Sequence, residues 1–174
     1  MDWITWPSAG LILTLAVGSA FGAPVATVVN GPGKIRGAAL CQFDDDSMTL
    51  VLTGDGKEIA RQYFCSSYGK SSAQVVTDAR GTSYVLLRYG EGRGTNATQE
   101  YLEIFGVAKD LVEYVRTPVS AGAGALSRWY YDHRVETPKG GGIKLILTRR
   151  VEGEDATWVP TEKTRVIEVG GSDS

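Results

Sequence analysis

Apolar and polar side chains alternate along much of the chain after residue 22, as they do in β-strands with one face buried and the other in water. In 127–136, apolar and aromatic residues dominate the odd-numbered positions, while the even-numbered positions carry charged residues or tyrosine. Residues 143–151 alternate in the same way, except at Ile146. Runs of β-branched and aromatic residues, separated by turn-forming residues, recur from Val25 to Val169 without helical periodicity. We therefore expect an all-β fold, an antiparallel up-and-down meander of about eight to ten strands that closes as a β-sandwich, a barrel or a partial propeller.

The connections between the predicted strands are of two kinds. Short, turn-rich links are expected at 53–57, 78–81, 108–110 and 138–141. Longer links are expected at 44–48, 66–71, 90–99, 118–126 and 152–157. The two kinds alternate along the chain, and successive connections of a meander lie at opposite ends of the sheet. All the longer links are therefore expected at one end.

This long-loop end is the candidate binding site, because loops held on a rigid scaffold often carry binding residues. The residues expected to contact a partner there are Tyr68, Lys70, Glu91, Arg93, Asn96 and Arg128. Arg93 offers a bidentate donor for a carboxylate or a phosphate. The alternative is that these links merely tolerate insertions, since extra loop length costs little.

Cys41 and Cys65 are the only cysteines, and we expect them to form a disulfide near the long-loop end. A redox or metal-binding pair would instead need CxxC-like spacing or several histidines, and the chain has neither.

Residues 1–22 have the layout of a secretory signal peptide. An apolar run over 11–17 is followed by small residues at Ala20 and Gly22, which favours cleavage after Gly22. The run is shorter than the roughly 20 apolar residues that span a bilayer. We expect one all-β domain over 23–174, exported to the periplasm or secreted, with no transmembrane span once the signal is removed. The alternative is that this segment forms an N-terminal strand or a buried helix.

Charge excludes some classes of partner. The 174 residues include 18 basic and 20 acidic side chains, a net charge of -2. Because the chain lacks a basic excess, nucleic acid and anionic membrane surfaces are not expected partners.

No motif in the chain specifies a reaction. His133 is the only histidine, and it lies on the apolar face of its strand, where a hydrogen-bonded core residue is expected rather than a catalytic base. The acidic run 44–46 lacks the ligand spacing of a calcium loop and is expected to be solvated. The glycine-rich segment 90–96 lacks the strand-to-helix context of a phosphate-binding loop. Trp129 is expected to pack in the core. No catalytic residue, metal or cofactor is expected.

These features favour a small non-enzymatic module that binds a protein of the cell envelope or an extracellular protein, as periplasmic inhibitors, immunity-type proteins and assembly accessories do. One alternative is a β-barrel carrier whose aromatic residues line a cavity for a small ligand. Another is a hydrolase that uses two carboxylates and no histidine.

Overall fold

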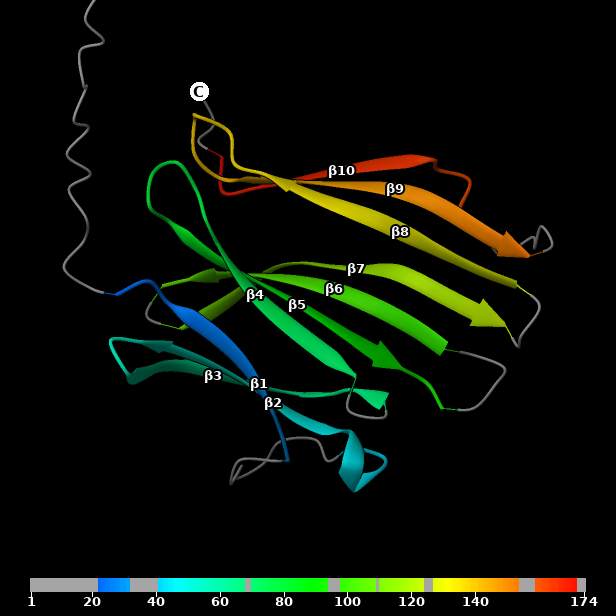
Figure 1. Cartoon of the computed structure of the whole chain (residues 1–174), viewed down its shortest axis with the longest axis horizontal. Coiled ribbons are helices and arrows are strands. Elements are labelled where there is room, and N and C mark those ends of the chain that lie inside the picture. Colours follow the sequence, from blue (N-terminus) through cyan, green and yellow to red (C-terminus); the bar gives the residue numbers. More distant parts are fainter. Residues whose placement is uncertain are drawn as a thin grey trace, which may run out of the picture.

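The computed structural model describes residues 22–31, 41–67, 70–93, 98–108, 110–123, 127–153 and 159–171. Within these residues the regular structure consists of strands and one 3-10 turn, η1 (Asp44–Asp46) (Figure 1). The strands are β1 (Val25–Asn30), β2 (Ser47–Gly54), β3 (Lys57–Cys65), β4 (Ser71–Thr77), β5 (Ser83–Glu91), β6 (Thr98–Val107), β7 (Leu111–Ala123), β8 (Ser127–Glu136), β9 (Ile143–Gly153) and β10 (Thr164–Val169).

The strands form two antiparallel sheets in which neighbours along the chain are neighbours in space. One sheet has the order β1-β2-β3, and the other has the order β10-β9-β8-β7-β6-β5-β4. The predicted all-β, up-and-down meander is thereby confirmed. The predicted short link at 53–57 also forms, as a tight hairpin between β2 and β3 in which Asp55 and Gly56 adopt positive φ angles of 51° and 72°.

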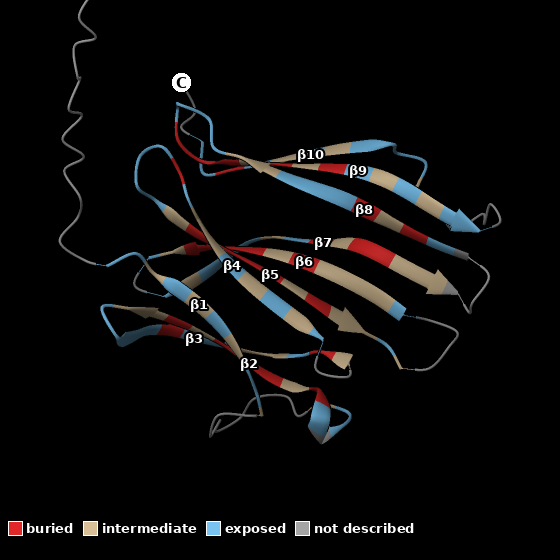
Figure 2. Ribbon diagram, in the orientation of Figure 1, coloured by how far each residue is buried: buried red, intermediate tan, exposed pale blue. Residues whose placement is uncertain are grey.

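The larger sheet folds over itself, so the molecule has three layers (Figure 1). Strands β4–β7 form the middle layer. The β1–β3 sheet covers one face of it, and β8–β10 cover the other. Figure 2 shows buried positions along β5 and β6, which lie between the two outer layers.

The side chains of strand β5 explain why both faces of the middle layer are covered by other strands. Val85 and Leu87 pack in the core shared with β2 and β3, whereas Tyr84 and Leu86 pack in the core shared with β8 and β9. All four are at most 2% exposed. Strand β5 is therefore apolar on both faces instead of alternating.

The fold-over occurs between β7 and β8. These strands pair only from Ser120↔Tyr130 to Ala123↔Ser127 and then diverge, as Figure 1 shows. The divergence lets β8–β10 lie across the middle layer, where Trp129 and Tyr131 are 4% and 2% exposed. The predicted core position of Trp129 is confirmed.

One predicted loop was wrong in part. Most of the expected link at 118–126 is strand, because β7 continues to Ala123. Its last residues pair with β6 on one side and with β8 on the other. A small-residue sequence was interpreted as a loop, but its small side chains suit the crowded corner where the sheet bends.

The buried carboxylate of Asp78 joins two turns at the short-turn end. Its Oδ1 accepts hydrogen bonds from the backbone N–H groups of Arg80 (2.8 Å) and Thr82 (2.9 Å) in its own turn. Its Oδ2 accepts one from the N–H of Gly142 (2.6 Å) in the β8–β9 turn. Burial acts to raise the pKa of Asp78, but these three donors outweigh it and hold the pKa below its ordinary value.

We predict that Asp78→Asn lowers the free energy of unfolding by about 1–3 kcal/mol at neutral pH, because an amide nitrogen would face backbone donors. The native pKa is depressed, so this stabilisation is present above the unfolded-state pKa near 3.8 and is lost as pH falls through the lower native value. Urea unfolding between pH 7 and 2.5 should show the gap between wild type and variant closing at acid pH. A gap that stays constant across this range would contradict the assignment, and the exposed Asp110→Asn serves as the control.

Candidate functional site

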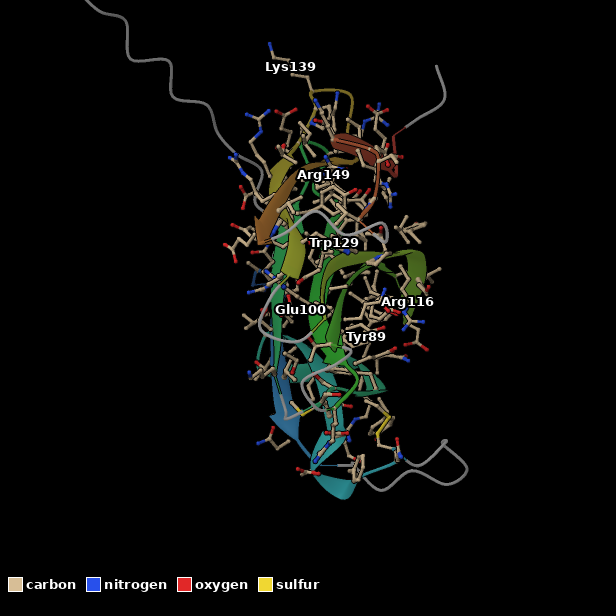
Figure 3. The ribbon with its side chains drawn as sticks, turned by 90° about the vertical axis from the view of Figure 1, so that its right-hand side faces the viewer. Tyr89, Glu100, Arg116, Trp129, Lys139 and Arg149 are labelled. Atoms are coloured by element: carbon tan, nitrogen blue, oxygen red, sulfur yellow. A yellow bond between two sulfur atoms is a disulfide. The ribbon has the colours of Figure 1, made fainter. Side chains whose placement is uncertain are left out.

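Three of the four described residues of the predicted site lie in two clusters at the long-loop end. Glu91 and Arg93 lie beside the disulfide, and Arg128 lies in a separate groove at the start of β8. Lys70 is exposed between β3 and β4. Tyr68 and Asn96 lie outside the described residues. Figure 3 views the molecule from this end, with Arg116 and Tyr89 on one side and Glu100 on the other.

The predicted disulfide between Cys41 and Cys65 is confirmed, with a Cα–Cα distance of 5.6 Å. It ties the segment before η1 to the end of β3. A small hollow of about 160 Å³ lies beside it, lined by Gln42, Phe43, Asp46, Cys65, Ser67, Gly90, Glu91, Gly92 and Arg93.

Arg93 is bound by carboxylates of its own chain. It contacts Asp45, and its Nε and Nη2 lie 3.1 Å and 2.5 Å from the two oxygens of Asp46. Its guanidinium also stacks 4.1 Å from the centre of the Phe43 ring. The hydrogen bonds that Arg93 donates to Asp46, and then those to Asp45, raise the pKa of Arg93 against the opposing effect of desolvation. The expectation that the whole acidic run is solvated was wrong for Asp46, which is 6% exposed because it holds Arg93.

A second arginine, Arg116 of β7, connects two further carboxylates. It contacts Glu91, and its Nε lies 3.5 Å from Oε1 of Glu103, which accepts a 2.9 Å hydrogen bond from the Tyr89 hydroxyl. The guanidinium lies 4.1 Å from the centre of the Tyr101 ring. Burial raises the pKa of Glu103. Sequence reasoning missed this cluster because it forms across β5, β6 and β7 and depends on their register.

A polar groove lies between β5 and β8 at this end, and we call it the β5–β8 groove. It has a volume of about 660 Å³ and is lined by Arg88, Arg128, Tyr130, Tyr131, Asp132, His133 and Glu152. Sequence reasoning found Arg128 but not Arg88, because the fold-over of the sheet alone brings β5 under β8.

Two arginines in the β5–β8 groove share one carboxylate. Arg88 contacts Glu100 with both Nε (3.1 Å) and Nη2. The nearest approach of Arg128 to Glu100 is 4.0 Å, and its Nε lies 3.4 Å from the hydroxyl of Ser120. The Arg128 side chain is 49% exposed. It is therefore loosely held, and guanidinium N–H groups remain available to a partner.

The acidic residues of the β5–β8 groove already have partners. Asp132 accepts a 2.8 Å hydrogen bond from Arg150, and Glu152 accepts a 3.2 Å hydrogen bond from the Tyr130 hydroxyl. The negative charge of Glu152 is the first cause of a raised pKa at Tyr130, so this hydroxyl stays protonated and donates. A ligand entering the groove thus meets a cation, Arg128, that no carboxylate of the described residues approaches closer than 4.0 Å, whereas Asp132 and Glu152 each already accept a hydrogen bond.

The prediction that His133 is a core residue was wrong. It shares the face of Trp129 and Tyr131, but it is exposed because β7 has already diverged from β8 at this position. Partial desolvation of its ring, followed by repulsion from Arg88, lowers the pKa of His133 against the opposing charge of Asp132. The lowered pKa favours the neutral imidazole, which offers one donor and one acceptor.

No metal site is apparent in the described part of the chain, where no group of three or more histidine, cysteine or acidic side chains converges. The same residues include no helix long and apolar enough to cross a membrane. Comparison of the chain with protein-family models, with curated proteins and with solved structures gave no match. The functional assignment therefore rests on the geometry of the site.

We predict that removing the disulfide lowers the free energy of unfolding by about 2–5 kcal/mol, because the cross-link restricts the unfolded chain. The double variant Cys41→Ala/Cys65→Ala avoids a stray thiol, and guanidinium unfolding of this variant and the oxidised wild type measures the difference. Equal midpoints would contradict the prediction. Reduced wild type should match the double variant.

Proposed function

We propose that this protein is a non-enzymatic module that binds a protein partner of the cell envelope or the extracellular space through the β5–β8 groove. The observation that carries the proposal is Arg128, whose side chain is half exposed and whose nearest carboxylate among the described residues is 4.0 Å away. The guanidinium carbon of Arg128 lies 5.4 Å from the centre of the Tyr130 ring. Arginine and tyrosine are enriched among the residues that dominate binding energy at protein interfaces.

The rigidity of the surroundings supports this assignment. Arg93 and Arg116 bind carboxylates from other segments of the long-loop end, and the disulfide adds a covalent link. Binding residues on a braced scaffold lose less conformational entropy when a partner docks. We assign Arg93 and Glu91 to this supporting structure and Arg128 to the contact itself.

The packing of the molecule favours a binding module over a carrier or a hydrolase. Leu50, Leu52, Val85 and Leu87 are fully buried and fill the space between the β1–β3 sheet and the middle layer. A carrier would need that space for its ligand. The carboxylates around Arg116 form an internal network, which suits packing rather than hydrolysis.

We predict that Arg128→Glu weakens partner binding by at least about tenfold, the usual minimum for a residue at the centre of an interface. The matched control is Lys139→Glu, which makes the same charge change in the exposed β8–β9 turn (Figure 3). Pull-down from an envelope extract would identify the partner, and titration calorimetry would compare the variants. Both should unfold within about 0.5 kcal/mol of wild type, because the changes are at the surface. Equal losses of binding in the two variants would contradict this site.

We also propose that the protein is exported and that its mature form begins at Ala23. The disulfide supports this, because such bonds persist in oxidising compartments. Cleavage after Gly22 leaves every described strand intact, since β1 begins at Val25, and among the described residues it removes the hydrogen bond from the Gly22 N–H to Asp55.

Intact-mass measurement of protein recovered from the periplasm or the medium should give a chain that starts at Ala23. An Ala20→Asp/Gly22→Asp variant should accumulate uncut, because signal cleavage needs small residues at these positions. Mature wild-type protein that retains Met1 would contradict the proposal.

A further inference from the structure

We infer that the free edge of β8 receives an extended segment of the partner protein, which adds to the sheet as a strand and places an acidic side chain on Arg128. This inference rests on the proposed function of the β5–β8 groove and specifies the mode of binding and the chemistry of the partner.

Within the part of the chain that the structure describes, the edge of β8 is unpaired beside the groove. Pairing with β7 stops at Tyr130, whereas pairing with β9 continues to Glu136. Over Tyr131–Glu136, β9 is therefore the only paired neighbour of β8 among the described residues. In an antiparallel strand, alternate residues direct N–H and C=O groups to the same edge, so this stretch presents a row of backbone donors and acceptors.

The edge is also regular enough to accept a strand. β8 pairs with β9 in one continuous register from Ser127 to Glu136, and 127–136 contain no proline. The facing part of β7 is less suitable, because it contains Pro118, which lacks an N–H, and its register with β6 shifts twice. An added strand would therefore pair with β8 rather than bridge the two strands.

The groove provides room beside this edge. Three consecutive residues of the unpaired stretch, Tyr131, Asp132 and His133, line it, and Arg88 lines it from β5. His133 is exposed, although it lies on the face of β8 that carries the buried side chains of Trp129 and Tyr131. An extended segment paired with β8 would cover His133 and run toward Arg128, where β8 and β7 meet.

The charged side chains of the β5–β8 groove determine which kind of segment would bind there. Asp132 and Glu152 are engaged by Arg150 and Tyr130, while Arg88 and Arg128 share the single carboxylate of Glu100. A carboxylate on the incoming strand would find unused donors on Arg128, whereas a lysine or arginine there would face like charge. The occupant is thus an extended acidic segment, recognised through its backbone and through one or more carboxylates.

Hydrogen exchange followed by NMR tests strand addition on the full-length mature protein. The probe is a blocked six-residue peptide in which valine and glutamate alternate, and the comparison peptide alternates valine and lysine. We expect the glutamate peptide to slow exchange of alternate amides within 131–136 by about tenfold or more at saturation, as new ladder hydrogen bonds form. The open edge of β10 (Thr164–Val169) serves as an internal control and should not change.

The variants separate the two parts of the inference. Arg128→Gln should weaken binding of the glutamate peptide by about tenfold, because it removes a charge-assisted contact, while Lys139→Gln should leave it unchanged. No protection of 131–136, equal protection of β10, or equal binding of the lysine peptide would overturn the inference. So would concentration-dependent dimers that protect this edge without peptide, because a second copy would then be the occupant.

The failure of this inference is distinguishable from failure of the proposed function. If Arg128→Glu abolishes binding of the natural partner but partner binding leaves amides 131–136 unprotected, the groove is the site and strand addition is wrong. If Arg128→Glu leaves partner binding intact, the proposed site itself is wrong.

Discussion

Strand β5 is apolar on both faces, and the need to cover both of them organises the molecule. Its two rows of side chains, represented by Leu86 and Leu87, are buried in different cores. Each core removes apolar surface from water, which is the main favourable contribution to folding. One sheet packed on one side would leave half of β5 exposed. The three layers follow from that constraint, with β1–β3 on one face and the folded-over β8–β10 on the other.

The fold-over has a cost that is visible at the corner between β7 and β8. Strands that must pair at one end and diverge at the other lose ladder hydrogen bonds along the diverging part. The same divergence exposes His133, opens the groove above Arg88 and leaves the edge of β8 without a partner. A structural requirement of the core thereby creates both the β5–β8 groove and the open edge beside it.

Three arginines at the long-loop end illustrate how similar side chains acquire different roles. Arg93 and Arg116 bind carboxylates from distant segments and stack on aromatic rings, so their donors are largely used within the fold. Arg128 has a hydroxyl at 3.4 Å and a carboxylate at 4.0 Å, distances at which hydrogen bonding is weak or absent. The bound arginines stiffen the scaffold, and the loosely held one remains available for recognition.

Several features could be predicted from local pattern because their causes are local. Alternation of apolar and polar residues marked the strands, and the turn-forming residues of 53–57 marked a short link, which the structure forms with Asp55 and Gly56 at positive φ angles. The pairing of Cys41 with Cys65 followed from their being the only two cysteines. The tendency of the longer links to gather at one end followed from the meander, which reverses direction at every turn.

Tertiary structure decided which neighbour covers each face and which charge meets each arginine. Periodicity places His133 with Trp129 on one face of β8, but exposure depends on whether β7 is still alongside, and that is determined where the sheet bends. The sequence indicated a solvated carboxylate at Asp46, but in the folded chain Asp46 accepts a hydrogen bond from Arg93, which is distant in sequence. Residues 118–123 resembled a loop because small side chains carry little strand signal, whereas their pairing with two neighbouring strands makes them part of a strand.

By itself, the sequence determined the strands, the hairpin and the disulfide, because those depend on neighbours in the chain or on a unique pair. The groove, its arginines and the open edge of β8 depend on strand register and sheet bending, which are set by the packing of whole layers.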